Sequence, residues 1–316
     1  LRSYQAIPGV EVAAICDIDP ARLDEIGDRY GVSERHTDPA RITAHPDLDV
    51  ISICSYDDAH AAQVVAALDH GKHVMVEKPV VLHPAEADQV LAALQRSSRF
   101  ITSNLILRKS PRFAELKRQI EAGELGDIHY VEGDYIHQIL WKITEGWRGK
   151  MDFYCTVYGG GIHLIDLMRW LLGREIVEVT ALATDLPTRG SSFRFPDLIA
   201  ALLRFDGGAL GKTTTYFGPQ RTKFHSLNVY GSRRVFINDL PNGKMFSGDR
   251  PEDEETVTTP YPGMEKGDML PEFIQSIREN RRPPLNEVDI FRTMSVCFAI
   301  WESVQSGRVV PVRQLI

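Results

Sequence analysis

Two patterns of hydrophobic and polar residues divide the chain. Up to Asn104, short apolar runs alternate with segments in which apolar residues recur every three or four positions. These are the periods of buried strands and amphipathic helices, and their alternation is typical of βαβ units in a parallel sheet. The predicted strands are 10–16, 49–54, 73–76 and 99–103, and the predicted helices are 20–30, 59–70 and 84–95.

Beyond Asn104, apolar and polar residues alternate one by one, as in antiparallel strands with one buried and one wetter face. The predicted strands are 128–136, 176–184, 198–205, 209–217, 224–230 and 233–238. The predicted helices are 111–123, 162–172, 270–279 and 288–305, and the acidic segment 248–266 is predicted to be a surface loop. We therefore expect an α/β domain over 1–104, with a doubly wound parallel sheet. An α+β domain over 105–316 should follow, with its helix 288–305 packing back on the first domain.

The first residues predict the end of a helix, followed by a turn at Pro8-Gly9. A domain of this type ordinarily begins with a strand and a helix, and a complete βαβ unit takes about 30 residues or more. We therefore expect that the first βα unit is missing, either by truncation or because the natural start lies upstream.

Polar residues follow each predicted strand of the first domain. They are Asp17, Ser55, Glu77-Lys78 and Asn104. Right-handed crossovers place the carboxyl ends of parallel strands on one edge of the sheet, where open α/β sheets bind ligands. Solvent-exposed charge at the end of a strand is the alternative explanation for any one of them. Four polar ends together favour a binding cleft.

Composition narrows the class of protein further. The 316 residues are 43% hydrophobic and 25% charged, as in ordinary globular proteins, and the net charge of -7 argues against a nucleic-acid surface. No signal peptide or membrane-spanning stretch is present, so we expect a cytoplasmic protein without a membrane partner. The four cysteines lack metal-site spacing and are expected to be buried small hydrophobes, with no metal site. They are Cys16, Cys54, Cys155 and Cys297.

Three motifs resemble one known family. They are CDIDP from residue 16, HAAQVVAALDHGKHVMVEKP from residue 60, and GGGIHLIDLMRWLLG from residue 159. Their order and spacing resemble the glucose–fructose oxidoreductase and inositol dehydrogenase family, also called Gfo/Idh/MocA. The resemblance implies a Rossmann domain that binds a nicotinamide cofactor and a second domain built on a large open sheet. It also implies hydride transfer to or from a secondary alcohol of a sugar, sugar derivative or cyclitol, by a homodimer or homotetramer formed through that sheet.

The residues of the first domain acquire cofactor roles from this resemblance. Asp17 can accept hydrogen bonds from the adenosine ribose and repel a 2′-phosphate, which favours NAD over NADP, although Arg22 could soften that preference. Helix capping is its alternative role, for which Asp19 competes. Ser55, Tyr56 and His60 stand where the family often has T-P-x-x-x-H, read here as SYDDAH. Because Tyr56 replaces the proline, that loop lacks the proline's rigidity, and His60 could be an ordinary residue of the first helical turn.

The EKP motif carries the expected chemistry. In the family, the glutamate, here Glu77, lies near the nicotinamide ribose, and the lysine, here Lys78, contacts the reacting hydroxyl. An ammonium group there would stabilise the developing alkoxide or polarise the ketone. Lys78 itself and Asn104 are further candidate contacts to the cofactor. A simple surface pair of Glu77 and Lys78 is the alternative.

His163 matches the family's catalytic histidine and could take the alcohol proton near neutral pH. Asp166 is three residues further along the same predicted helix, where it could orient the imidazole. Many relatives have D-x-x-x-H, but Gly159 stands at the aspartate position. Tyr158, Tyr154 or Asp152 could fill that gap, or the proton relay could run through Lys78 and His163 alone. A core histidine with a capping partner is the structural alternative.

The remaining substrate candidates are Arg108, Trp147 and Arg148, in addition to Lys78 and His163. Packing of Trp147 and plain surface charge on Arg148 are the alternatives. Two other functions are compatible with the motifs. One is a sugar-nucleotide 3-dehydrogenase, and the other is a non-catalytic, dinucleotide-sensing regulator, which Gly159 and the missing βα unit would favour.

Overall fold

The computed structural model describes residues 1–219, 224–262 and 264–316, which form two compact units. Unit 1 comprises Leu1–Asn104 and Glu265–Phe291, and unit 2 comprises Leu105–Met264 and Arg292–Ile316. The division after Asn104 coincides with the predicted one. The segment Glu265–Phe291 belongs to unit 1, although the sequence analysis placed it in the second domain. Helix α10 (Glu287–Ser306) continues from unit 1 into unit 2, and its packing on the first domain stays a prediction.

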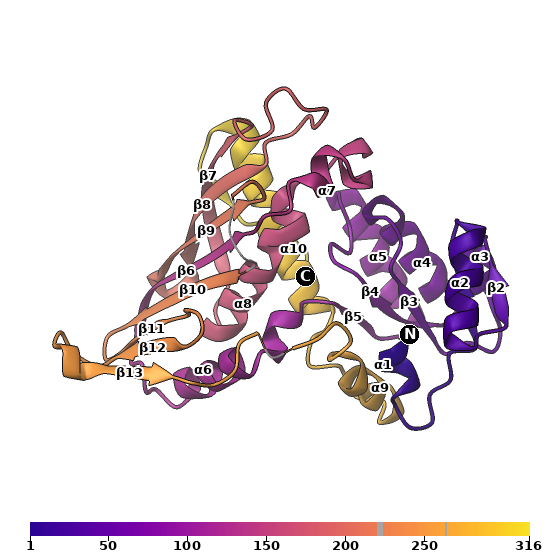
Figure 1. Ribbon diagram of the computed structural model, residues 1–316, viewed down its shortest axis with the longest axis horizontal. Coiled ribbons are helices and arrows are strands. Elements are labelled where there is room, and N and C mark those ends of the chain that lie inside the picture. Colours follow the sequence, from indigo (N-terminus) through magenta and orange to yellow (C-terminus); the bar gives the residue numbers. More distant parts are fainter. Residues whose placement is uncertain (220–223, 263) are drawn as a thin grey trace. The chain divides into compact units, whose positions relative to one another are not determined.

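Unit 1 has the predicted alternation of parallel strands and helices (Figure 1). Its strands are β1 (Ala14–Cys16), β2 (Glu34–His36), β3 (Val50–Ile53), β4 (His73–Val76) and β5 (Ile101–Ser103). Its helices are α1 (Arg2–Gln5), α2 (Pro20–Tyr30), α3 (Pro39–Thr43), α4 (His60–Asp69), α5 (Pro84–Ser97) and α9 (Leu270–Arg278). Short β2 and α3 were not predicted, because three and five residues are too few to show a period.

The strands of unit 1 form two parallel sheets rather than the single expected one. Strand β1 pairs with β2, whereas β3, β4 and β5 form a separate sheet in that order. Among the described residues, no strand bridges β1 to β3. The consequence is that the strand ends of β3, β4 and β5 share one edge, and Asp17 stands at the end of another sheet.

Position in the sheet decides how deeply each strand is buried. The central strand β4 is buried on both faces over all four residues, as predicted from its apolar run. Strand β3 is an edge of its sheet among the described residues, and Ser52 is exposed. The prediction that all four cysteines are buried is wrong for two of them: Cys54, beyond β3, is exposed, and Cys16 is partly exposed.

Helix α9 belongs to unit 1 because its apolar face completes a core there. Ile7 and Met75 pack with α9 residues, and the guanidinium of Arg278 donates a 2.6 Å hydrogen bond to the carbonyl of Pro8. The α9 residues in this core are Leu270, Phe273 and Ile274. These partners lie about 200 or more residues from α9 along the chain, so no local pattern could reveal the packing.

Unit 2 is built on a nine-stranded sheet in the order β13-β12-β11-β10-β6-β9-β8-β7-β14. Among the described strands of this sheet, β6 and β9 form the parallel pair and the other neighbours are antiparallel, which confirms the predicted mostly antiparallel sheet. The strands are β6 (Ile128–Ile136), β7 (Ile176–Thr184), β8 (Leu198–Phe205), β9 (Leu210–Tyr216), β10 (Phe224–Gly231), β11 (Val235–Ile237), β12 (Gly243–Phe246), β13 (Glu254–Val257) and β14 (Val310–Pro311).

The predicted loop 248–266 contains an edge strand, so that prediction is wrong in part. Strand β13 pairs with β12, although its residues Glu254–Val257 are acidic and largely exposed. An edge strand has no need of an apolar alternation, and charge on it prevents further pairing. Position 263 lies outside the described residues.

Helices cover one face of the large sheet. Helix α8 (Ile162–Leu172) packs against β6 and α6 (Pro111–Glu121) packs against α8, as Figure 1 shows. Helix α7 (Trp141–Thr144) is a single turn in the connection that follows β6. Within the described ranges, no helix is long and apolar enough to cross a membrane.

Candidate active site

The carboxyl ends of β4 and β5 bring two predicted cofactor residues together in unit 1. Val76 pairs with Ser103 in the parallel register, so the residues that follow these strands are neighbours. The side-chain amide of Asn104 donates a 2.9 Å hydrogen bond to the carboxylate of Glu77. The amide oxygen of Asn104 is buried and has no hydrogen-bond partner among the described residues. A buried acceptor in this state is costly unless a ligand satisfies it.

His60 holds the loop that carries Lys78. Its ring is fully buried, with Nδ1 2.7 Å from the carbonyl of Pro79 and Nε2 3.2 Å from the carbonyl of Ser55. The histidine therefore ties the turn after β4 to the turn after β3. Lys78 directly precedes Pro79, the residue that His60 holds, and is partly exposed. In the same turn, the hydroxyl of Ser55 donates to Gln63 at 2.9 Å, and Tyr56 is exposed.

The sequence left open whether Asp17 or Asp19 caps the following helix, and in the structure Asp19 does so. Asp19 is the N-cap of α2, because its carboxylate accepts hydrogen bonds from the backbone of Ala21 and Arg22. Asp17 accepts one bond from the backbone of Asp19 at 3.0 Å and lies 3.7 Å from the guanidinium of Arg22. Its partly exposed carboxylate thus remains accessible at the end of β1.

In unit 2, α8 begins with an unusual turn. A π-helical turn, Val157–Gly161, precedes the helix, and such turns are frequent at functional sites. His163 follows in the first turn of α8. It is partly exposed, whereas every other residue from Gly161 to Arg169 is buried. The helix therefore presents His163 from an otherwise buried segment.

Aromatic and imidazole rings surround His163. The ring of Tyr135 stacks on it with centroids 6.3 Å apart, and the ring of His225 meets it edge-on at the same distance. Tyr135 and His225 face each other because they are paired in the register of β6 and β10. We call this group the histidine–tyrosine cluster; its members are Tyr135, His137, His163, His225 and Tyr261.

Tyr261 lies within hydrogen-bonding distance of two atoms of His225. The hydroxyl of Tyr261 accepts a 3.0 Å bond from the backbone N–H of His225 and lies 2.6 Å from its Nδ1. Burial raises the pKa of Tyr261 above its ordinary value, so the phenol keeps its proton. Phenol and imidazole are both groups that can donate or accept a hydrogen bond.

Arg112 packs against the ring of Tyr261. Its guanidinium is buried and lies 5.5 Å from the ring centroid of Tyr261. It donates to the side-chain oxygen of Asn238 at 2.8 Å and to the carbonyl of Asp239 at 2.7 Å. These contacts hold the loops after β11 and β13 in place around the cluster.

Two predicted substrate residues lie beside the cluster. The guanidinium of Arg148 stacks over the ring of Trp147, 4.1 Å from its centroid. Burial raises the pKa of Tyr135 to about 12, and the positive charge of nearby Arg148 partly offsets that rise. The hydroxyl of Tyr135 lies 3.4 Å from Nδ1 of His137. Phenol and imidazole groups therefore converge near His163, and the charge of Arg148 reaches Tyr135.

The structure joins Asp166 to Arg108. The carboxylate of Asp166 is fully buried and accepts two hydrogen bonds from Arg108, at 2.9 and 2.5 Å. The hydroxyl of Thr293 also donates to Asp166, at 3.4 Å. The sequence assigned Asp166 to the imidazole and Arg108 to the substrate, whereas this geometry engages the two with each other.

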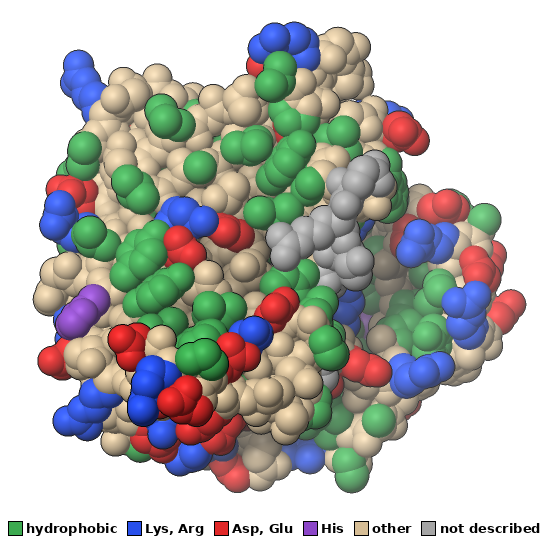
Figure 2. All heavy atoms as spheres, turned by 60° about the vertical axis from the view of Figure 1, so that its left-hand side comes forward, with side chains coloured by type: hydrophobic (Ala, Val, Ile, Leu, Met, Phe, Trp, Pro, Cys, Tyr) green, Lys and Arg blue, Asp and Glu red, His purple; other side chains and the backbone are tan. Residues whose placement is uncertain are grey.

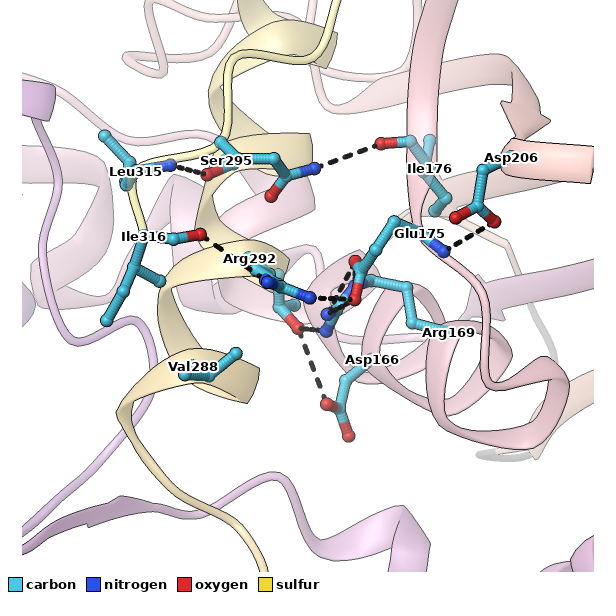
Figure 3. Close-up of polar contacts among 12 residues, drawn as sticks. Asp166, Arg169, Glu175, Ile176, Asp206, Val288, Arg292, Ser295, Leu315 and Ile316 are labelled. Carbon is cyan, nitrogen blue, oxygen red and sulfur yellow. Dashed lines mark hydrogen bonds and ion pairs between the residues drawn. The ribbon is translucent and has the colours of Figure 1, made fainter.

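Hydrogen bonds and ion pairs continue from Asp166 to Arg292, as Figure 3 shows. Arg169 donates to Thr293 at 2.8 Å and forms a two-pronged ion pair with Glu175. Arg292 lies 3.0 Å from the same carboxylate of Glu175. The network links α8 to α10 within unit 2, which fixes the helix that carries His163.

The sequence analysis missed Tyr135, His225 and Tyr261. A signal was present for the first two, because each occupies a buried position of an alternating strand, where a polar ring is unusual. Their pairing across two strands could not be read from either strand alone. Tyr261 offered no signal.

Comparison with known proteins identifies the chain. Residues 1–105 match the NAD-binding Rossmann fold of the Gfo/Idh/MocA oxidoreductase family, and residues 117–312 match that family's C-terminal α/β domain. The fold and the matches define an NAD-binding oxidoreductase of the two-domain type. The chain belongs to the Gfo/Idh/MocA family. The predicted family, fold class, enzyme class and cofactor are thereby confirmed.

The chain is similar to several named relatives over most of its length. It is 25% identical to a myo-inositol 2-dehydrogenase of Thermotoga maritima, over 96% of this chain and 91% of that protein. It is 28% identical to an inositol 2-dehydrogenase of Saccharopolyspora erythraea, over 97% of this chain and 89% of that protein. A levoglucosan dehydrogenase solved with NADH and levoglucosan has the same fold, with a TM-score of 0.86 at 22% identity over 99% and 95% of the two chains.

Proposed function

We propose that this protein transfers a hydride between NAD and a secondary alcohol or ketone of a sugar, sugar derivative or cyclitol. The observation that carries the proposal is the setting of His163, a partly exposed imidazole at the start of an otherwise buried helix, within a cluster of hydrogen-bonding rings. Lys78, held next to the anchored Pro79, supplies the complementary ammonium group.

Each residue has a distinct chemical task in the proposed reaction. The imidazole of His163 takes the proton of the substrate hydroxyl, and the ammonium of Lys78 stabilises the alkoxide that forms. NAD, when bound, accepts the hydride from the carbinol carbon. In the reverse direction, Lys78 polarises the ketone oxygen and His163 returns the proton.

Unit 1 supplies groups that fit a dinucleotide. The unsatisfied amide oxygen of Asn104 can accept a hydrogen bond from a ribose hydroxyl, beside Glu77. The accessible carboxylate of Asp17 suits the hydroxyls of the adenosine ribose and disfavours a 2′-phosphate, so we propose NAD rather than NADP. Ser55 and Tyr56 lie in the turn after β3, whose sheet also carries Glu77 and Asn104 at its strand ends. His60 contributes by holding that turn.

The substrate class is proposed from two supports. Relatives of this chain are named inositol dehydrogenases, and a structure of the same fold contains levoglucosan. The histidine–tyrosine cluster, with Trp147 and Arg148 beside it, offers both donors and an aromatic surface, which suits a compound with several hydroxyl groups. Arg108 is the weaker substrate candidate, because Asp166 occupies its guanidinium.

The first test is turnover with NAD over a panel of inositols, pyranoses and levoglucosan, followed by NADH absorbance. We expect at least one compound to be oxidised. His163→Asn is expected to lower kcat by about 10²–10⁴, the usual contribution of a general base, with NAD affinity retained. His129→Asn removes an exposed histidine of β6 and serves as the matched control. NAD binding without turnover on any compound would favour the regulatory alternative instead.

We also propose that the protein is a homodimer or homotetramer formed through the large sheet. The face of this sheet opposite α8 bears Leu182, which is 80% exposed, and Leu202. Figure 2 shows hydrophobic side chains gathered in groups on this side of the molecule, with charged side chains between them. Lys212 and Asp134, on the neighbouring strands β9 and β6, form an ion pair 2.9 Å apart. Exposed apolar groups within a polar frame are typical of an interface.

Light scattering after size exclusion tests this assembly. The double variant Leu182→Glu/Leu202→Glu is expected to elute with a smaller mass than the wild-type oligomer, because it places carboxylates in the proposed interface. Ile18→Glu changes a residue of unit 1 that is 70% exposed and should leave the mass unchanged. A monomeric wild type, or a double variant with wild-type mass, would contradict the proposal.

A further inference from the structure

A buried arginine lies next to the histidine–tyrosine cluster without an ion pair. Arg112 is 1% exposed, and its guanidinium donates hydrogen bonds to neutral oxygens at 2.7–2.9 Å. These acceptors are the side-chain oxygen of Asn238 and the carbonyls of Asp239, Pro241 and Thr259. In the described part of the chain, no carboxylate lies within ion-pair distance of this guanidinium. A full positive charge is therefore buried among neutral groups.

The position of Arg112 is unfavourable for a cation in two respects. Burial lowers the pKa of its guanidinium, and Tyr261 and the exposed Asp239 offset only part of that effect. Arg112 also lies in the first turn of α6, the end of a helix that carries a partial positive charge. A neutral glutamine could donate to the same carbonyls without burying a charge. The hydrogen bonds alone therefore do not explain why this residue is charged.

Arg112 is close enough to His225 to influence its charge. The guanidinium lies 5.5 Å from the ring centroid of Tyr261, which lies 6.3 Å from the ring centroid of His225. It is therefore within about 12 Å of the imidazole, where a unit charge shifts a pKa by about one unit at an effective dielectric constant of about 20. A positive charge disfavours the imidazolium form, and the burial of His225 acts in the same direction.

Three rings contact the imidazole of His225, and two cations act on those rings. The rings are Tyr135, His163 and Tyr261, and the cations are Arg112 and Arg148. Burial raises the pKa of both phenols, so they stay protonated and supply no negative charge. The contact with Tyr261 is compatible with either charge state of His225, because a phenol can donate or accept a hydrogen bond. The charge of Arg112 therefore distinguishes the two states where the hydrogen bond does not.

We infer that Arg112 keeps His225 neutral, so that His163 alone accepts the proton of the substrate. The rings of the two histidines meet edge-on, with centroids 6.3 Å apart. An imidazolium at His225 would repel the positive charge that His163 acquires when it takes the proton. Arg112 is thus a positioning residue, which acts through His225 and does not touch the substrate. The inference rests on the proposed function, because it assigns the proton transfer to His163.

Two variants of Arg112 separate its charge from its hydrogen bonds. Arg112→Gln and Arg112→Lys both lose donors to the carbonyls, but only Arg112→Gln loses the charge. In Arg112→Gln the acid limb of the kcat–pH profile is expected to move up by about one pH unit, because His225 now becomes charged at a higher pH. At high pH, where both imidazoles are neutral, kcat should stay within a few-fold of the wild type. Arg112→Lys should keep the wild-type profile.

Arg118→Gln is the matched control. Arg118 lies on the same helix, is exposed and pairs with Glu115, so its variant should keep the wild-type profile. Circular dichroism and NAD binding report whether each variant folds. A wild-type profile in folded Arg112→Gln would overturn the inference. So would equal losses of kcat at every pH in Arg112→Gln and Arg112→Lys, because a purely structural role of Arg112 has that result.

A second measurement does not depend on turnover. The imidazole signals of His225, followed by NMR during a pH titration of the wild type, should titrate about one unit or more below the ordinary value of about 6.5. The midpoint should rise by about one unit in Arg112→Gln and stay in place in Arg112→Lys. A wild-type His225 that is charged at pH 6.5 would overturn the inference, even if Arg112→Gln failed to fold or no substrate were found. The expected titrations without turnover of any compound would instead count against the proposed function alone.

Discussion

Replacing Lys78 by alanine is expected to lower kcat by about 10²–10³, because one preorganised donor to a developing oxyanion contributes that much. NAD affinity should stay within a few-fold of the wild type, since the ammonium contacts the reacting hydroxyl rather than the cofactor. Steady-state kinetics on the best substrate of the panel, with NAD affinity from calorimetry, measures both quantities.

Lys244→Ala is the control for this variant. Lys244 on β12 pairs with Glu254 on the edge strand β13 at 3.0 Å, and its removal should leave kcat unchanged. An unchanged rate in Lys78→Ala would remove Lys78 from the mechanism. A loss of NAD affinity as large as the loss of rate would make it a cofactor residue instead.

Replacing Arg108 by methionine is expected to lower the free energy of unfolding of unit 2 by about 3–5 kcal/mol. The side chains of Arg108 and Asp166 are 8% and 0% exposed, so the variant would leave a carboxylate buried without its counter-charge. All four tryptophans lie in unit 2, and urea unfolding followed by their fluorescence therefore reports on this unit.

Two further variants test whether the loss of stability comes from the buried, uncompensated charge. Arg189→Met removes an exposed ion pair with Asp185 and should change stability little. Arg108→Met/Asp166→Leu removes both buried charges and should recover part of the loss, because no uncompensated charge remains. Equal stability of Arg108→Met and Arg189→Met would show that the buried pair does not stabilise α8.

Local patterns predicted the long elements well. The bounds of β4, β6, β7, β8 and α8 are those expected from the sequence. In β6, β7, β8 and α8 the apolar period repeats several times, and β4 is a continuous apolar run between turn residues. Short elements such as α3 and the charged edge strand β13 were missed, because neither shows a full period or an apolar face.

The strand ends of unit 1 were also readable from the sequence. Glu77 and Asn104 follow adjacent parallel strands and form a hydrogen bond, as the common edge of a parallel sheet requires. We expected Asp17 at the same sheet edge, and this prediction is wrong because its strand β1 pairs with β2 in a separate sheet. Strand order depends on pairing between distant segments, which no single strand records.

The family, the Rossmann fold, the nicotinamide cofactor and the prominence of Lys78 and His163 followed from the sequence alone, because motifs and periods are local properties of the chain. Only the tertiary structure decided that Arg108 binds Asp166, that Tyr135 and His225 face His163, and that Arg112 lies against Tyr261. These contacts depend on strand register and on three-dimensional packing, so they exist only once the chain has folded.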